Sequence, residues 1–127
     1  MIRGTTAPFK FILPILGSQV ATVEIQFWQR NNYGTPEAPL PITLHKESCV
    51  LLDDSYEMGV TLSPEQTRRF SDKRKASVQG LITDVNGFKY GIKEQLITVY
   101  PLYSGTTTGD VPEQDDNGFI ILDGYNV

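Results

Sequence analysis

The chain has 127 residues, of which 39% are hydrophobic and 20% are charged, and its formal net charge is −4. This length suits one domain, and the composition is ordinary for a globular protein. The acidic balance argues against a broad nucleic-acid-binding surface, because such a surface needs positive charge to displace counterions from phosphates. The single cysteine, Cys49, excludes an internal disulfide and favours folding in a reducing cytoplasm. Residues 1–6 lack the features of a signal peptide, and no apolar run approaches the ~20 residues of a membrane helix, so we expect no membrane partner.

The first strands are predicted by period-two alternation. Residues 9–13 alternate apolar with other side chains, which predicts a strand that ends at Pro14. Residues 22–28 form the clearest strand, with apolar side chains on one face and Trp28 on the opposite face. A turn is expected at residues 31–34, because Asn and Gly tolerate positive φ.

The middle of the chain predicts three short strands and one helix. Residues 35–41 contain three prolines and predict a stiff, extended loop. Apolar residues then predict strands at residues 42–44, 50–52 and 56–62. The sequence Ser-Pro-Glu-Gln at residues 63–66 is typical of a helix start, since serine can cap the helix and glutamine follows three residues later.

The helix is expected to end near residue 70, where Phe70 would drop into the core. Residues 75–85 alternate again and predict another strand. Asn86-Gly87 is the strongest hairpin signal in the chain and predicts a type I′ turn before a return strand at residues 88–92. Residues 96–102 predict a further strand, or a continuation of the return strand after a bulge near Lys93-Glu94.

These elements predict an all-β fold, an antiparallel β-sandwich that is immunoglobulin-like in outline, with one short helix near residues 64–70. A small open barrel is the alternative. We expect the sandwich to occupy residues 1–103, a flexible acidic linker to follow at residues 104–118, and a C-terminal strand or docking tail to occupy residues 119–127.

The C-terminal run is the first candidate for partner binding. It consists of Phe119, Ile120, Ile121 and Leu122. A short, apolar, β-prone run behind a linker has two destinations: the edge of its own sheet, or the sheet of another subunit.

A second candidate is the basic cluster formed by Arg68, Arg69, Lys73, Arg74 and Lys75. It indicates either a solvated helix end whose cations guard an edge strand, or a surface for an acidic protein partner. The overall acidity of the chain disfavours nucleic acid as that partner. Trp28 is a third candidate, either as an exposed anchor for a partner or sugar, or as part of a second small core.

No pattern in the sequence indicates chemistry, and we predict a protein that is not an enzyme and has no cofactor. His45 is the only histidine, and no sequence motif indicates the partner residues that a catalytic triad or a metal site would need. Cys49 precedes an apolar run, which favours a structural, buried thiol. The acidic residues at 110–116 lack the spacing of a calcium-binding loop, so no metal site is predicted.

Several segments carry a resemblance to known proteins. They are Met-Ile-Arg-Gly-Thr-Thr-Ala-Pro at residues 1–8, Ile-Gln-Phe-Trp-Gln at 25–29, Val-Thr-Leu-Ser-Pro-Glu-Gln-Thr at 60–67 with Phe70, Val-Gln-Gly at 78–80 and Asp-Val-Asn-Gly at 84–87. In order and spacing they resemble a family of small structural proteins of tailed phages and prophages of gut Firmicutes, which begin close to "MIRGTTP". More loosely, the chain is similar to the N-terminal β-domains of baseplate upper proteins. Ala7, residues 35–41 and the C-terminal tail depart from the family's usual form.

The resemblance implies a virion component and supplies no catalytic residues. We therefore expect a phage structural or assembly protein, made in the bacterial host cytoplasm and built into the virion, either in the head or in the tail and baseplate. Its partners would be other virion proteins and further copies of itself, joined by strand and tail exchange. The alternative is a carbohydrate- or host-receptor-binding sandwich, with Trp28, Tyr33 and Tyr103 as its platform.

Overall fold

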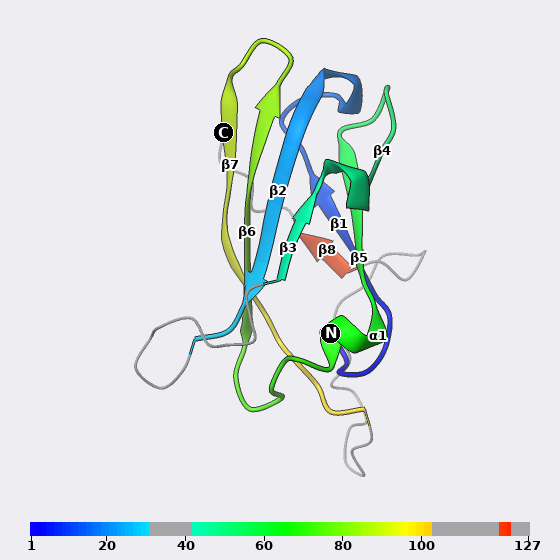
Figure 1. The fold of residues 1–127 in the computed structure, drawn as a ribbon, viewed down its shortest axis with the longest axis vertical. Helices are drawn as coiled ribbons and strands as arrows, with labels where there is room; N and C mark the ends of the chain where they lie inside the picture. Colours follow the sequence, from blue (N-terminus) through cyan, green and yellow to red (C-terminus); the bar gives the residue numbers. More distant parts are fainter. Residues whose placement is uncertain (31–41, 103–119, 123–127) are drawn as a thin grey trace.

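The computed structural model describes residues 1–30, 42–102 and 120–122, the last of these as backbone only. In this part of the chain two four-stranded sheets pack face to face (Figure 1). The first sheet has the order β4-β5-β1-β8 and is made of β1 (Ala7–Ile12), β4 (Cys49–Leu51), β5 (Glu57–Leu62) and β8 (Ile120–Leu122). The second has the order β3-β2-β6-β7 and is made of β2 (Val20–Trp28), β3 (Ile42–His45), β6 (Ala76–Asp84) and β7 (Lys89–Ile97).

Three short helical segments connect the strands: η1 (Gly17–Gln19), η2 (Lys46–Ser48) and α1 (Pro64–Thr67). The predicted all-β sandwich with one short helix is confirmed, and two separate sheets form in place of a barrel. Neighbouring strands are antiparallel, apart from β8, which runs parallel to β1. A parallel pair needs a long connection between its two strands, and the elements from η1 to β7 lie between β1 and β8 in the chain.

The core lies between the two sheets and is built from the predicted alternation. Phe9 of β1 meets Phe27 of β2 across the layers, with ring centroids 5.1 Å apart and planes tilted by 47°. This tilted arrangement suits aromatic rings, whose positive edges are attracted to negative faces. The largest fully buried side chains around this pair include Phe11, Ile25, Met58, Leu62, Phe70 and Ile82.

The helix start and the position of Phe70 are both confirmed. The Ser63 hydroxyl accepts a hydrogen bond from the Gln66 backbone at 3.1 Å, and the Gln66 side chain accepts one from the Ser63 backbone at 2.8 Å. These two bonds satisfy backbone N–H groups that the helix itself leaves unpaired. Phe70 follows α1 and is fully buried.

The hairpin between β6 and β7 forms where Asn86-Gly87 predicts it, but the predicted type I′ turn is wrong. Gly87 has φ +87°, whereas Asn86 does not have positive φ. The Gly87 backbone N–H donates to the Asp84 carbonyl at 3.1 Å, and neither central residue, Val85 or Asn86, has positive φ, as in a type I turn followed by a left-handed glycine. The Asp84 carboxylate also accepts hydrogen bonds from the backbone N–H groups of Asn86 at 2.8 Å and Phe88 at 2.9 Å.

The predicted bulge is confirmed in β7. The register between β6 and β7 shifts between Val78 and Gly80, where Lys93 and Glu94 together oppose one residue of β6. Gly80 lies at this point because a Cβ atom there would come within 2.4 Å of the Ile25 side chain.

Candidate interaction surfaces

The predicted docking run lies at an edge of the first sheet. Ile120 pairs with Phe9, and Leu122 pairs with Phe11, so β8 extends the sheet beside β1 of its own chain. Phe119 and the predicted linker at residues 104–118 lie outside the described residues.

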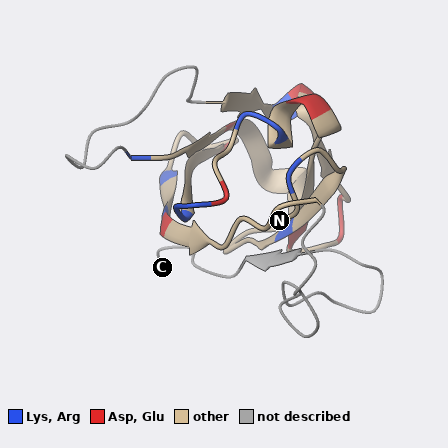
Figure 2. Cartoon of the chain, turned by 90° about the horizontal axis from the view of Figure 1, so that it is seen from below, with Lys and Arg blue, Asp and Glu red and all other residues tan. Residues whose placement is uncertain are grey.

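A basic end forms around α1 and the loop that follows it. Figure 2 looks at this end and shows lysine and arginine segments gathered there. The basic end consists of Arg3, Arg68, Arg69, Lys73, Arg74 and Lys75, which are six of the chain's eleven lysines and arginines. Arg68 and Arg69 are exposed, and Arg74 is half-buried. Arg3 joins them because its guanidinium donates to the carbonyl of Arg68 at 3.0 Å.

One buried glutamine holds the loop of the basic end in place. Gln29 is 2% exposed, and its amide group donates to the carbonyls of Ser71 at 2.8 Å and Arg74 at 3.0 Å. The Ser71 backbone N–H donates back to the Gln29 side-chain oxygen at 2.8 Å. The role of Gln29 was not predicted from the sequence, where it is a single polar residue directly after the predicted strand at residues 22–28.

Trp28 is not an exposed anchor, and that interpretation is wrong. The side chain is 6% exposed and belongs to the same hydrophobic core cluster as Phe9 and Phe27, so the second small core that the sequence left open does not form among the described residues. The Arg30 guanidinium lies 5.3 Å from the centre of its ring and is ion-paired with Glu94 of β7. The hydrogen bond from Arg30 lowers the pKa of Glu94 from its usual range. Arg30, which Glu94 holds in place, thus lies over the tryptophan at the strand end. The other proposed platform residues, Tyr33 and Tyr103, lie outside the described residues.

The polar groups of His45 and Cys49 do not form a nucleophile and a base. The Cys49 thiol donates to the backbone carbonyl of His45 at 3.4 Å. Burial raises the pKa of the Cys49 thiol to about 11, with Glu47 contributing in the same direction. The thiol is half-buried, so it stays protonated at neutral pH and is a poor nucleophile. Within the residues that the structure describes, no group of three His, Cys, Asp or Glu side chains is placed to hold a metal ion.

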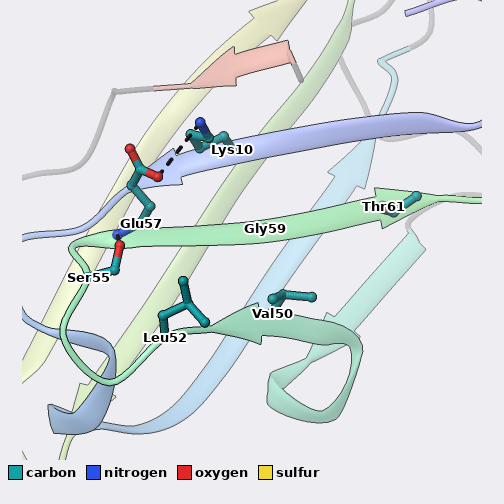
Figure 3. Close-up of a pocket in the computed structure, with 7 residues that line it drawn as sticks. All are labelled: Lys10, Val50, Leu52, Ser55, Glu57, Gly59 and Thr61. Carbon is teal, nitrogen blue, oxygen red and sulfur yellow. Dashed lines mark hydrogen bonds and ion pairs between the residues drawn. The ribbon is translucent and has the colours of Figure 1, made fainter. Parts of the chain in front are cut away.

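An apolar hollow lies on the outer face of the first sheet (Figure 3). Its volume is about 240 Å³, and it is lined by Lys10, Val50, Leu52, Ser55, Glu57, Gly59 and Thr61. Gly59 is at its centre, because the register pairs this glycine with Lys10 of β1 on one side and Val50 of β4 on the other. Small-molecule pockets are typically ~300–1,000 Å³, so this hollow fits one large side chain better than a cofactor.

Charge and exposed apolar surface meet at the hollow. Val50 and Leu52 form one wall and are 68% and 61% exposed, and Lys10 forms an ion pair with Glu57 at 3.7 Å on the other side (Figure 3). The hollow was not predicted from the sequence. The feature of the sequence that indicates it is a glycine, Gly59, at an outward position of β5 between the outward-facing Glu57 and Thr61.

No helix in residues 1–30 or 42–102 is long and apolar enough to cross a membrane. No protein family model matches the sequence, and no curated protein sequence matches it. The resemblance to phage structural proteins therefore stays a prediction, and the function must be argued from the surfaces of the molecule.

Proposed function

We propose that this protein is a structural or assembly protein of a phage virion, an accessory β-domain that joins other virion proteins and further copies of itself. It would be made in the bacterial host cytoplasm and incorporated into the particle. The observation that carries the proposal is the pairing of β8 with β1 at a sheet edge, which comprises three residue pairs within the described residues.

A strand of this kind suits exchange between molecules. Residues 103–119 separate β8 from the rest of the described chain. Seventeen residues span at most about 60 Å when fully extended, which is farther than the width of a small domain. The same three backbone pairings can therefore form with β1 of a neighbour, leaving both sandwiches unchanged. Main-chain pairing would give affinity, and the side chains of the run would give specificity.

A binding role also fits the chemistry of the described residues better than the alternatives. The Cys49 thiol is held protonated, so it does not provide a nucleophile. The carbohydrate-binding alternative needs an aromatic platform, and Trp28 is buried beneath Arg30.

The test compares the full chain with a chain that lacks residues 105–127. We expect the full chain to self-associate or to bind another virion protein, and the shortened chain to remain a folded monomer by light scattering and circular dichroism. Ile120→Pro is the matched point variant, because proline removes one donor from the strand and should weaken association without removing the tail. Ile120→Val is its control and should behave as the unmodified chain.

Two outcomes would overturn the proposal. If the shortened chain unfolds, β8 is an integral strand of its own sandwich and is not available for exchange. If association persists unchanged in the shortened chain, the tail is not the joining element. The virion assignment is tested separately by asking whether the protein co-purifies with intact particles at a fixed copy number.

A further inference from the structure

The tip of the β6–β7 hairpin exposes two apolar side chains on a fixed backbone. Val85 and Phe88 are 64% and 65% exposed. The Asp84 carboxylate holds the turn, and the Val85 backbone N–H donates to the Gln19 carbonyl of η1 at 3.0 Å. An exposed aromatic side chain on a backbone that is already ordered loses little entropy when it binds, which is the usual property of an interface anchor.

The apolar hollow has the complementary shape. It offers space for about one large side chain and an apolar wall formed by Val50 and Leu52. Phe88 of the same molecule does not line the hollow. The hairpin belongs to the second sheet, whereas the hollow opens on the outer face of the first sheet.

The charges beside the two features are also complementary. Lys89 follows Phe88 directly and is exposed. Asp53 and Asp54 follow Leu52 directly, in the turn between β4 and β5, and both are exposed. An aromatic side chain that enters the hollow with its neighbouring lysine towards this turn would bring opposite charges together, which favours association and fixes orientation.

We propose that Phe88 of one copy of this chain inserts into the apolar hollow of a second copy. The contact is heterologous, because the tip of one molecule meets a different surface of the next, so the same contact can repeat along a row of copies. The inference deepens the proposed assembly function by naming a second copy as a partner, but it uses surfaces distinct from β8.

Such a contact is small and should be weak by itself. Interfaces that bury less than about 1,200 Å² are typical of transient encounters. In an assembly many such contacts act together, so weak single contacts can still order neighbouring copies. The test must therefore detect binding at high protein concentration and locate it on the surface.

The experiment uses two full-length variants that each keep one half of the contact. Phe88→Ser removes the inserted side chain and leaves the hollow intact, whereas Val50→Lys adds a cation to the hollow wall and leaves the hairpin intact. Both positions are exposed, so both variants should fold. Isotope-labelled Phe88→Ser chain is titrated with unlabelled Val50→Lys chain, and amide chemical shifts are followed by NMR; the labelling is then reversed.

We expect the first titration to shift amides around residues 50–61 and the reversed titration to shift amides around residues 84–89. A titration of labelled Phe88→Ser with unlabelled Phe88→Ser should shift neither region at concentrations at least tenfold above those that give shifts in the mixed pair. Leu96→Ser is the control for exposed apolar surface, because Leu96 is 60% exposed on β7 away from the tip, and this change should have no effect.

Three results would overturn the inference: no shifts in either titration, shifts that map elsewhere, or equal binding by all the variants. Shifts confined to β1 and β8 would support strand exchange while rejecting the Phe88 contact. Conversely, association that persists unchanged without the tail, together with the expected shifts at the hollow, would reject the tail proposal alone. The two proposals therefore fail independently.

Discussion

At the end of the sandwich that carries α1, buried side chains join neighbouring loops, whereas at the hairpin end backbone hydrogen bonds join η1 to the two turns beside it. At the α1 end, Gln29 makes three hydrogen bonds to the loop of the basic end, and buried Thr67 donates its hydroxyl to the Thr5 carbonyl at 2.7 Å. At the hairpin end, the Gly17 backbone N–H donates to the Ser55 carbonyl at 2.8 Å. There the η1 backbone also bonds the turn between β4 and β5 and the hairpin tip.

The difference indicates which residue types each end requires. The α1 end depends on side chains of the right length and polarity, because a buried polar group without its partner is costly. The hairpin end depends on close approach of two backbones, which only a residue without Cβ allows. The proposed interaction features follow the same division, since Gln29 joins the loop of the basic end to β2, whereas a backbone hydrogen bond joins the hairpin tip to η1.

Gly17→Ala, at the hairpin end, should give the largest loss of stability. A Cβ atom at this position would lie 2.2 Å from the Leu52 carbonyl oxygen and 2.9 Å from its carbonyl carbon, so one backbone must move. We expect the free energy of unfolding to fall by about 3 kcal/mol, measured by urea denaturation.

Gly91→Ala is the matched control for this prediction. A Cβ atom at Gly91 meets nothing within 4 Å, so this variant should stay close to the unmodified chain. A Gly17→Ala variant as stable as Gly91→Ala would contradict the claim that backbone approach holds the hairpin end.

Gln29→Leu should give the second-largest loss of stability, at the α1 end. The change leaves the Ser71 N–H and two loop carbonyls without their partner, and we expect a loss of about 2 kcal/mol. The loop of the basic end should also be cleaved faster by trypsin after residues 73–75. Gln26→Leu is the control, because the hydrogen bond that this amide donates to the Thr43 hydroxyl is long, at 3.4 Å, and exposed at the surface. Equal stability of the two variants would mean that Gln29 does not hold the loop.

Local patterns in the sequence predicted the elements at both ends. Strand alternation, the capping residues Ser63 and Gln66, and the site of the hairpin each depend on neighbours a few residues away, so they can be recognised in the sequence. The turn type could not be predicted, because the Asp84 carboxylate selects a type I turn that Asn86-Gly87 does not require.

Features that depend on distant residues escaped prediction. Arg30 lies over the Trp28 ring and is ion-paired with Glu94, a residue of a distant strand, whereas alternation alone places Trp28 on the solvent face. The apolar hollow requires Lys10, Gly59 and Val50 to lie side by side in three strands. Strand order and register set that arrangement, and no single segment of the sequence determines either of them.

Ser63→Ala should give a smaller effect, confined to the α1 end. It removes the hydroxyl that accepts from Gln66, and loss of such a cap costs about 1 kcal/mol. Hydrogen exchange should accelerate at Thr67 and Phe70 and stay unchanged at the hairpin. Ser63→Asp keeps an acceptor at the cap and should restore protection. Equal exchange in the two variants would show that packing of Phe70, rather than the cap, orders α1.

The smallest expected effect concerns Cys49 and can be measured on the unmodified protein, without any substitution. Burial raises its thiol pKa from 9.0 to about 11, so the folded chain retains the proton between these values and the free energy of unfolding should fall as pH rises from 9 to 11. At pH 8 the thiolate fraction is about 100-fold lower than in the unfolded chain, partly offset by the higher nucleophilicity of a more basic thiolate. Alkylation should therefore be roughly tenfold slower in the folded chain.

The alkylation rate of the Cys49 thiol also distinguishes local opening at the hairpin end from local opening at the α1 end. Cys49 begins β4, and Leu52, which follows that strand, is the residue against which Gly17 packs. Gly17→Ala should therefore accelerate alkylation of Cys49 at low urea concentration, by opening this edge of the sheet locally. Gln29→Leu should accelerate it only in proportion to its loss of global stability, because its contacts lie at the other end. If both variants change alkylation in proportion to stability alone, the two ends open together and the division between them has no dynamic consequence.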